Sequence, residues 1–339
     1  MSREVFAAAH VVTADERTVD WDATLRFRHH LWDLGLGVAE AMDTAQRGMG
    51  LEWPTAAELI KRSAAEATGR ICAGVATDHL RGEVTIDDVQ EAYVEQLDVV
   101  VTAGAQPVLM CSRQLAAAAR GPEAYAKVYG ALLDQVSEPV ILHWLGTAFD
   151  PALEGYWGAR DVTDATNNFL QIIREHSAKV DGVKVSLLDA DHEIGLRRAL
   201  PDGVRCYTGD DFNYPELIAG DEHGYSDALL GIFDPIAPVA AKALRALDSG
   251  DTAGFRKIID PTVPLSRHLF SAPTYYYKTG VVFLAWLAGH QDHFLLLDGL
   301  QTARSVEHLA EAKRLAELAG VVDPELANRR WSEWLAQSR

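Results

Sequence analysis

Short apolar runs alternate with polar turns and helical patterns along the first two thirds of the chain. Several of these runs are continuously apolar, which is typical of parallel strands that are covered on both faces. The pattern predicts eight strands, at residues 5–12, 38–42, 71–75, 107–111, 139–143, 182–185, 204–207 and 228–232.

The segments between these runs carry the end signals and the periodicity of helices. Thr55-Ala-Ala-Glu58 and Thr85-Ile-Asp-Asp88 predict two helix N-termini, because the threonine hydroxyl accepts from a free backbone N–H and the acid favours the positive helix end. Pro122 stands where a helix accepts proline. Apolar residues then recur at helical spacing on one face: Tyr125, Val128, Tyr129, Leu132, Leu133 and Val136.

Eight strands that alternate with helices favour a closed (β/α)8 TIM barrel over an open, doubly wound sheet. An open nucleotide-binding sheet needs a glycine-rich loop after its first strand, and Thr13-Ala-Asp-Glu-Arg17 contains no glycine. From Pro235 onward only helical patterns remain, including a long one at residues 305–318. The sequence therefore predicts an α/β protein, with a barrel catalytic domain at 1–240 and a C-terminal helical domain at 241–339.

Composition and charge narrow the possible partners. The formal net charge of −18 argues against nucleic acid and anionic membrane, which both recruit basic surfaces. The longest apolar stretch, residues 281–288, is far shorter than the ~20 residues that span a membrane. The three cysteines, Cys72, Cys111 and Cys206, have no zinc-ligand spacing, so we expect buried reduced thiols. We expect a cytoplasmic protein that acts on a small molecule.

In a TIM barrel the active site forms at the C-terminal ends of the strands. Polar residues stand at seven of the eight predicted strand ends: Asp43, Thr44, Thr77, Asp78, His79, Ser112, Arg113, His143, Lys184, Thr208, Asp210, Asp211 and Asp234. These residues are the candidates for the chemistry.

Lys184 is the most unusual candidate, because it interrupts a short, otherwise apolar strand. Burial lowers the pKa of a lysine toward neutrality, and a free amine can attack a carbonyl to form an iminium, which accepts electrons from an adjacent bond. Alternatively, Lys184 faces outward or pairs with a carboxylate such as Asp210 or Asp211.

The segment Asp181-Gly-Val-Lys184-Val-Ser186 resembles the lysine strand of the dihydrodipicolinate synthase and N-acetylneuraminate lyase superfamily of Schiff-base aldolases. Three other segments resemble its third, fifth and seventh strands in the correct order: Ile71-Cys-Ala-Gly-Val75, Pro139-Val-Ile-Leu142 and Thr208-Gly-Asp-Asp211. The likeness covers most of residues 1–240. It implies a barrel with a helical C-terminal domain, a homo-oligomer (dimer or tetramer), and Lys184 as a Schiff-base lysine that needs no cofactor.

The chain departs from this family at two places. A tyrosine that moves protons stands at the end of the family's fifth strand, where this chain has His143; histidine does the same work near neutral pH. A structural histidine at the barrel mouth is the alternative. The family members that use pyruvate hold its carboxylate with a Gly-Thr-Thr-Gly-Glu turn, whereas this chain has Ala41-Met-Asp-Thr-Ala45, in which Asp43 would repel a 2-oxo acid.

Carboxylates accept strong hydrogen bonds from alcohols. We therefore expect a polyhydroxylated keto-sugar or related carbohydrate derivative, cleaved or dehydrated next to its carbonyl. The predicted substrate-binding residues are Asp43, Thr44, Asp78, Arg113, Asp210 and Asp211. Asp210 and Asp211 are alternatively a charge balance for Lys184 and a helix cap, and Arg113 is either a site for a carboxylate or phosphate or a surface residue.

Two other functions remain open on the sequence. A divalent metal held by Asp43, Asp78, His79, His143 and Asp210 would make the chain a metal-dependent lyase or isomerase. A non-catalytic homologue that binds a sugar-like ligand is the second. The aromatic residues Trp144, Trp157 and Tyr275-Tyr-Tyr-Lys278 are expected to pack in the core or against another subunit.

Overall fold

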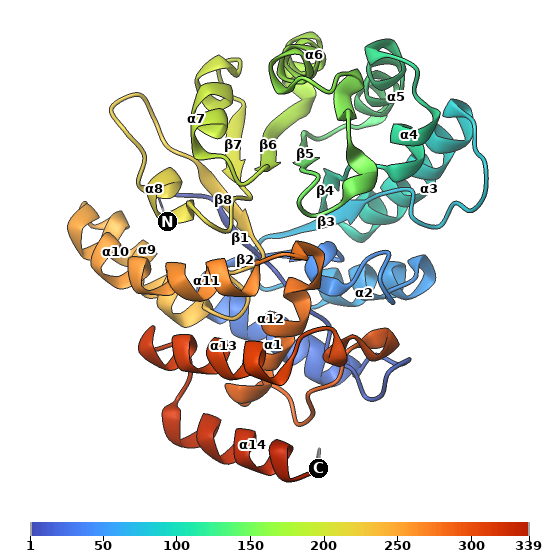
Figure 1. Cartoon of the computed structure of the whole chain (residues 1–339). Helices are drawn as coiled ribbons and strands as arrows, with labels where there is room; N and C mark the ends of the chain where they lie inside the picture. Colours follow the sequence, from blue (N-terminus) through green and yellow to red (C-terminus); the bar gives the residue numbers. More distant parts are fainter. Residues whose placement is uncertain (1, 338–339) are drawn as a thin grey trace.

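Eight parallel strands close into one barrel, as predicted (Figure 1). The computed structural model describes residues 2–337. The strands pair in sequence order, and β1 closes the barrel by pairing with β8. They are β1 (Val5–Ala8), β2 (Gly37–Glu40), β3 (Ile71–Val75), β4 (Gln106–Leu109), β5 (Val140–Leu145), β6 (Val180–Ser186), β7 (Arg205–Thr208) and β8 (Asp227–Leu230). Each overlaps a predicted run. The first run extends beyond β1 because Ala9, Val11 and Val12 remain buried after the strand has ended.

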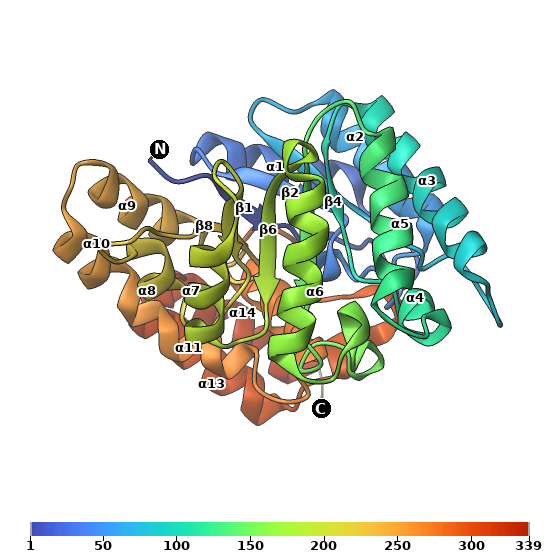
Figure 2. The same cartoon turned by 90° about the horizontal axis from the view of Figure 1, so that it is seen from above.

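Helices cover the outer face of the strands. They are α1 (Trp21–Asp33), α2 (Trp53–Ala65), α3 (Ile86–Ala103), α4 (Arg113–Ala118), α5 (Pro122–Gln135), α6 (Val162–Glu175), α7 (Ala190–Ala199), α8 (Tyr214–Ala219) and α9 (Ala237–Asp248). Figure 2 shows α3, α5 and α6 side by side along this face.

The predicted helix starts were correct at two of three places. Thr85 caps α3, where its Oγ1 accepts from Asp88 N at 3.2 Å and the Asp88 carboxylate accepts from Thr85 N at 2.7 Å. Pro122 opens α5. The start at Thr55 was wrong: α2 begins at Trp53, because Pro54 suits a first helical turn and Trp53 is buried.

The barrel interior is filled by side chains rather than open. Its inner cluster consists of Phe6, Ala8, Ala39, Met42, Cys72, Ala76, Val108, Met110, Ile141, Tyr207 and Leu229. A larger cluster fills the space between the strands and the helices. The three cysteines are free thiols. This filling leaves the barrel mouth as the place for polar chemistry.

The rest of the chain is helical. It forms α10 (Thr252–Ile259), α11 (Val263–Leu269), α12 (Tyr277–Leu287), α13 (Val306–Leu318) and α14 (Pro324–Gln337). Figure 1 shows α12, α13 and α14 together on one side of the barrel. Every residue of α12 is buried, and its start contacts the short 3-10 helix η1 (Asp43–Ala45) after β2. The predicted domain boundary at residue 240 falls inside α9. Within the described residues, no helix combines the length and the apolar character needed to cross a membrane.

Candidate active site

Lys184 lies on β6 between neighbours on both adjacent strands. Its Cα partners are His143 on β5 and Tyr207 on β7, and its side chain is only 8% exposed. Its amine forms no hydrogen bond or ion pair with any residue in the described part of the chain, so neither Asp210 nor Asp211 neutralises it by contact. Burial lowers the pKa of Lys184, and the charges of Asp43 and Asp211 only partly oppose this.

His143 is a fully buried neutral imidazole beside Lys184. Its Nε2 lies 3.1 Å from Ser186 Oγ, while its Nδ1 has no hydrogen-bond partner among the described residues. Burial, followed by the charge of Lys184, holds the pKa of His143 well below its usual value. The lowered pKa keeps the imidazole unprotonated at physiological pH, and Nδ1 remains available for a hydrogen bond to a ligand.

Ser186 and Gly209 lie next to Lys184, although the sequence analysis did not select them as candidates. Ser186 follows Lys184 by two residues and therefore points to the same side of β6. A Cβ on Gly209 would lie 2.1 Å from Ser186 Oγ and 2.9 Å from Lys184 Cε. Only glycine therefore lets the backbone after β7 pass this close to the lysine.

The two aspartates after β7, Asp210 and Asp211, accept hydrogen bonds from different parts of the backbone. Asp210 closes the turn before α8, since its carboxylate accepts from Phe212 N at 2.8 Å and Asn213 N at 3.0 Å. Asp211 accepts from Ile232 N at 2.9 Å. Burial raises the pKa of Asp211 to about 7, although the charge of Lys184 acts in the opposite direction. Asp211 is thus a carboxyl group near Lys184 that titrates near neutrality.

Asp43 and Thr44 stand at the barrel mouth in η1. Thr44 Oγ1 lies 2.8 Å from the phenolic oxygen of Tyr277, which comes from α12. Asp43 lines two adjoining cavities of about 210 Å³ and 30 Å³. Both cavities are also lined by Arg47, Arg113, Leu145 and Asp150.

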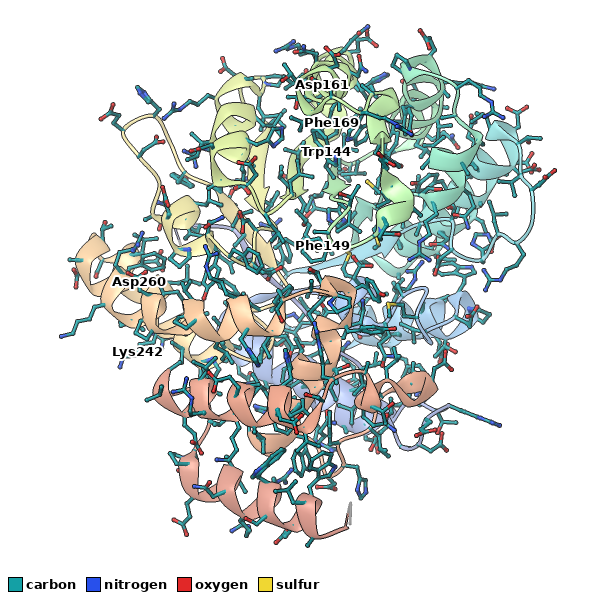
Figure 3. All side chains as sticks on the ribbon, in the orientation of Figure 1. Trp144, Phe149, Asp161, Phe169, Lys242 and Asp260 are labelled. Atoms are coloured by element: carbon teal, nitrogen blue, oxygen red, sulfur yellow. The ribbon has the colours of Figure 1, made fainter. Side chains whose placement is uncertain are left out.

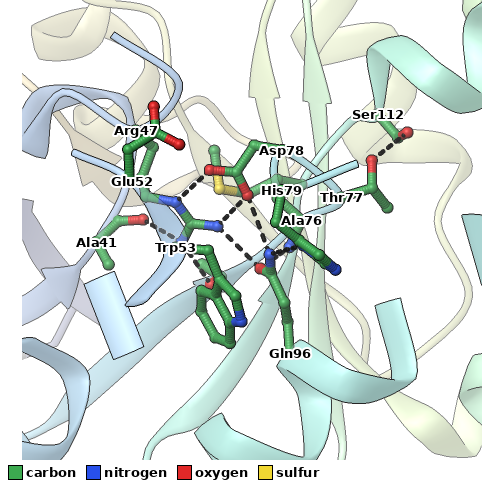
Figure 4. Close-up of polar contacts among 12 residues, drawn as sticks. Ala41, Arg47, Glu52, Trp53, Ala76, Thr77, Asp78, His79, Gln96 and Ser112 are labelled. Atoms are coloured by element: carbon green, nitrogen blue, oxygen red, sulfur yellow. Dashed lines mark hydrogen bonds and ion pairs between the residues drawn. The ribbon is translucent and has the colours of Figure 1, made fainter. Parts of the chain in front are cut away.

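Asp78 and Arg113 are already engaged in ion pairs. Figure 4 shows Asp78 held by Arg47, with Asp78 Oδ1 at 2.6 Å from the guanidinium and at 3.0 Å from Gln96 Nε2. Arg113 opens α4, is about half exposed (55%), and pairs with Asp150. The carboxylate of Asp78 therefore positions Arg47, whereas Arg113 keeps an exposed edge toward the cavity.

The sequence reasoning missed two residues from the C-terminal helices. The ring of Tyr277 is buried, stacks on Phe270 at 4.2 Å and lies 6.3 Å from Phe149. Lys278 is 3% exposed, lines the smaller cavity, and donates to the carbonyl oxygen of Tyr275 at 3.0 Å. Burial lowers its pKa to about 8. The cluster at 275–278 was visible in the sequence but was interpreted as packing.

The tryptophans pack as expected. Trp157 is fully buried and stacks on Phe169 at 4.3 Å, and Figure 3 shows Trp144 next to Phe169, with 5.5 Å between ring centres.

The ligand set considered for a metal is dispersed. His79 Nδ1 contacts Gln96 at 2.9 Å, Asp78 binds Arg47 and Asp210 closes its own turn. Within residues 2–337, no three His, Cys, Asp or Glu side chains form a group suited to a metal ion.

The chain matches one protein-family model over nearly its whole length. The family model described as "Protein of unknown function (DUF993)" matches residues 1–338. No curated protein matches the chain in sequence.

Solved dihydrodipicolinate synthase structures share the fold. The enzyme from Thermotoga maritima is 14% identical with a TM-score of 0.73, over 94% of this chain and 99% of that one. The enzyme from Aquifex aeolicus is 14% identical with a TM-score of 0.72, over 94% and 98%. The chloride-inhibited enzyme from Acinetobacter baumannii, complexed with pyruvate, is 15% identical with a TM-score of 0.71, over 95% and 100%. The resemblance inferred from the sequence is therefore confirmed for the fold.

Proposed function

The chain belongs to the family described as "Protein of unknown function (DUF993)", and we propose that this member is an aldolase-type lyase that forms a Schiff base through Lys184. The observation that carries the proposal is the buried amine of Lys184, which has no ion-pair partner among the described residues and lies beside a neutral histidine. An unpaired buried ammonium is costly, so the pKa falls and the nucleophilic free amine becomes accessible.

The reaction begins when Lys184 Nζ attacks the carbonyl carbon of the substrate. Loss of one water from this adduct gives an iminium. In C–C cleavage the hydroxyl group on the β-carbon loses its proton, the Cα–Cβ bond breaks, the β-carbon fragment leaves as an aldehyde or ketone, and the electron pair of the broken bond converts the iminium to an enamine; protonation of the enamine carbon and addition of one water then release the second product and restore the amine. In dehydration the Cα proton is removed to give the enamine, the β-hydroxyl group takes up a proton and leaves as water, and addition of one water releases the unsaturated product and the amine. We assign the proton transfers to His143, and Asp211 is close enough to Lys184 to stabilise the iminium charge.

The substrate that we propose is a polyhydroxylated keto-sugar or related carbohydrate derivative, for C–C cleavage or dehydration. Asp43 is an acceptor for hydroxyl groups, and the 210 Å³ cavity that it lines opens at the C-terminal ends of β3 and β4. The Acinetobacter enzyme is complexed with pyruvate, but the carboxyl group of Asp43 disfavours a substrate carboxylate at the turn after β2 here. No cofactor is required by this chemistry.

Trapping with borohydride tests the proposal directly. The protein is reduced in the presence of keto-sugars and 2-oxo acids, and the adduct is located by intact mass and peptide mapping. We expect a single adduct on Lys184, stronger with hydroxylated ketones than with pyruvate. Lys242→Met is the control, because Lys242 is exposed and its loss should leave the adduct on Lys184 unchanged.

Other outcomes would contradict this function. Trapping that persists in Lys184→Met, or adducts spread over exposed lysines, excludes the Schiff base at this position. Activity without any trapped adduct would favour the metal-dependent lyase, and ligand binding without turnover would favour a sugar-binding homologue. We further propose that the chain is a homo-oligomer, which light scattering after size-exclusion chromatography measures.

A further inference from the structure

Asp43 and Lys278 face the same small cavity without touching each other. Lys278 donates to the Tyr275 carbonyl oxygen at 3.0 Å and to Met49 Sδ at 3.4 Å, and it forms no ion pair with a carboxylate of residues 2–337. The carboxylate of Asp43 likewise has no hydrogen-bond or ion-pair partner in that part of the chain. An unpaired ammonium and an unpaired carboxylate thus line one cavity.

The remaining charges around this cavity are neutralised in pairs. Arg47 is held by Asp78 and by the carbonyl oxygens of Ala41 and Gly74. Arg113 is held by Asp150. Among the described charged residues that line this cavity, Lys278 and Asp43 are the two without an ion-pair partner.

The chemistry of this pair selects one kind of group. An ammonium only donates hydrogen bonds and an ionised carboxylate only accepts them. A hydroxyl group between them accepts from one and donates to the other, so it satisfies both. A substrate carboxylate or phosphate would be repelled by Asp43, and a substrate ammonium would be repelled by Lys278.

The size of the cavity agrees with this selection. Its volume of about 30 Å³ has room for one water-sized group, such as a single hydroxyl. The adjoining cavity of about 210 Å³ accommodates the rest of a small substrate.

We infer that Lys278 and Asp43 together bind a hydroxyl group of the substrate, with Lys278 as the donor and Asp43 as the acceptor. This inference rests on the proposed function and deepens it, because it identifies the residues that distinguish a hydroxylated ketone from a plain one. Lys278 is then a specificity residue supplied by the C-terminal helices.

Methionine methyl signals provide a test that does not need the Schiff base. The chain has four methionines, and Met49 contacts Lys278 directly. Protein labelled with carbon-13 at the methionine methyl groups is titrated with erythritol, which has hydroxyl groups but no carbonyl. The comparison compound is 1,2-dimethoxyethane, whose ether oxygens accept hydrogen bonds but cannot donate one to Asp43. We expect a saturable shift of the Met49 signal with erythritol, and half-saturation at about tenfold higher concentration or more with dimethoxyethane, as for a lost hydrogen bond to a charged group.

Substitutions at the pair separate this inference from its alternatives. Asp43→Asn and Lys278→Met should each weaken erythritol binding by about tenfold or more, and the double variant should lose little beyond either single one. The exposed Lys242, labelled in Figure 3, supplies the control Lys242→Met, which should bind as the unaltered protein does.

Three results would overturn the inference: equal binding of erythritol and dimethoxyethane, unchanged erythritol binding in both single variants, or a Met49 response to inorganic phosphate but not to erythritol. Because erythritol cannot form an iminium, these results do not depend on whether Lys184 is trapped by borohydride.

Discussion

Replacing Lys278 by methionine should stabilise the protein at neutral pH and remove a specific part of its pH dependence. Methionine keeps the length and apolar character of the side chain but has no charge. In the native protein, burial lowers the pKa of Lys278 from 10.5 to about 8. At about 1.36 kcal/mol per pKa unit, this difference corresponds to about 3 kcal/mol of folding free energy.

The direction in which the free energy of unfolding changes with pH follows from proton binding. Between pH 8 and 10.5 the unfolded chain holds this proton more tightly than the folded one, so the free energy of unfolding of the native protein rises with pH. Below pH 8 the whole destabilisation of about 3 kcal/mol is present. Losing the hydrogen bond to Tyr275 costs the variant about 1 to 3 kcal/mol at every pH. The advantage of the variant over the native protein should therefore shrink by about 3 kcal/mol as pH rises from 7 to 10.5.

Urea unfolding at several pH values, followed by tryptophan fluorescence, measures this difference. Other titrating groups are common to both proteins and cancel in the comparison. Lys242→Met serves as the control, since its side chain is exposed and its difference should stay flat. A difference for Lys278→Met that is independent of pH from 7 to 10 would refute the statement that a lone ammonium is buried at this position.

Three other predictions concern Lys184 and the residues around it. Asp211→Asn should raise the free energy of unfolding above pH 7, because a pKa raised from 3.8 to about 7 costs the native protein up to about 4 kcal/mol of stability as pH rises through this interval. Urea unfolding midpoints of the variant and the native protein at pH 4 and pH 8 measure this difference. A difference that is equal at both pH values would contradict the raised pKa of Asp211. Gly209→Ala should reduce borohydride trapping on Lys184 at least about tenfold, since the new methyl group would overlap Ser186 and contact Lys184 too closely. An adduct yield equal to that of the native protein would show that the backbone after β7 moves to make room for the methyl group. Dialysis against a chelator should leave trapping on Lys184 unchanged, and loss of trapping that added Mg²⁺, Mn²⁺ or Zn²⁺ restores would favour the metal-dependent lyase.

The strands and the placement of Lys184 could be predicted because they depend on local pattern. The strands are largely buried on both faces and are therefore mostly apolar, and a lysine inside such a run is conspicuous. The partners of the polar residues could not be predicted in the same way. Arg47 follows η1 after β2, and Asp78 follows the neighbouring strand β3, but no spacing along the sequence encodes the contact between the two side chains.

The position of Lys278 beside the cavity that Asp43 lines could not be predicted from local sequence either. More than 230 residues separate it from Asp43, and the position of α12 depends on how the C-terminal helices pack against the barrel. The error at Thr55 has a local cause instead. A threonine with an acid three residues later predicts a cap, but Pro54 and the buried Trp53 already begin the helix.

The burial of α12 at the barrel mouth has a consequence for how such a chain can diversify. Tyr277 and Lys278 form part of the wall around the cavity, although every strand of the barrel lies before residue 231. In the function that we propose, changes in a helix outside the barrel can therefore alter which molecule is accepted while the lysine strand stays untouched. A chain shortened to residues 1–240 would keep Lys184 and Asp43 but lose Tyr277 and Lys278 from the wall of this cavity.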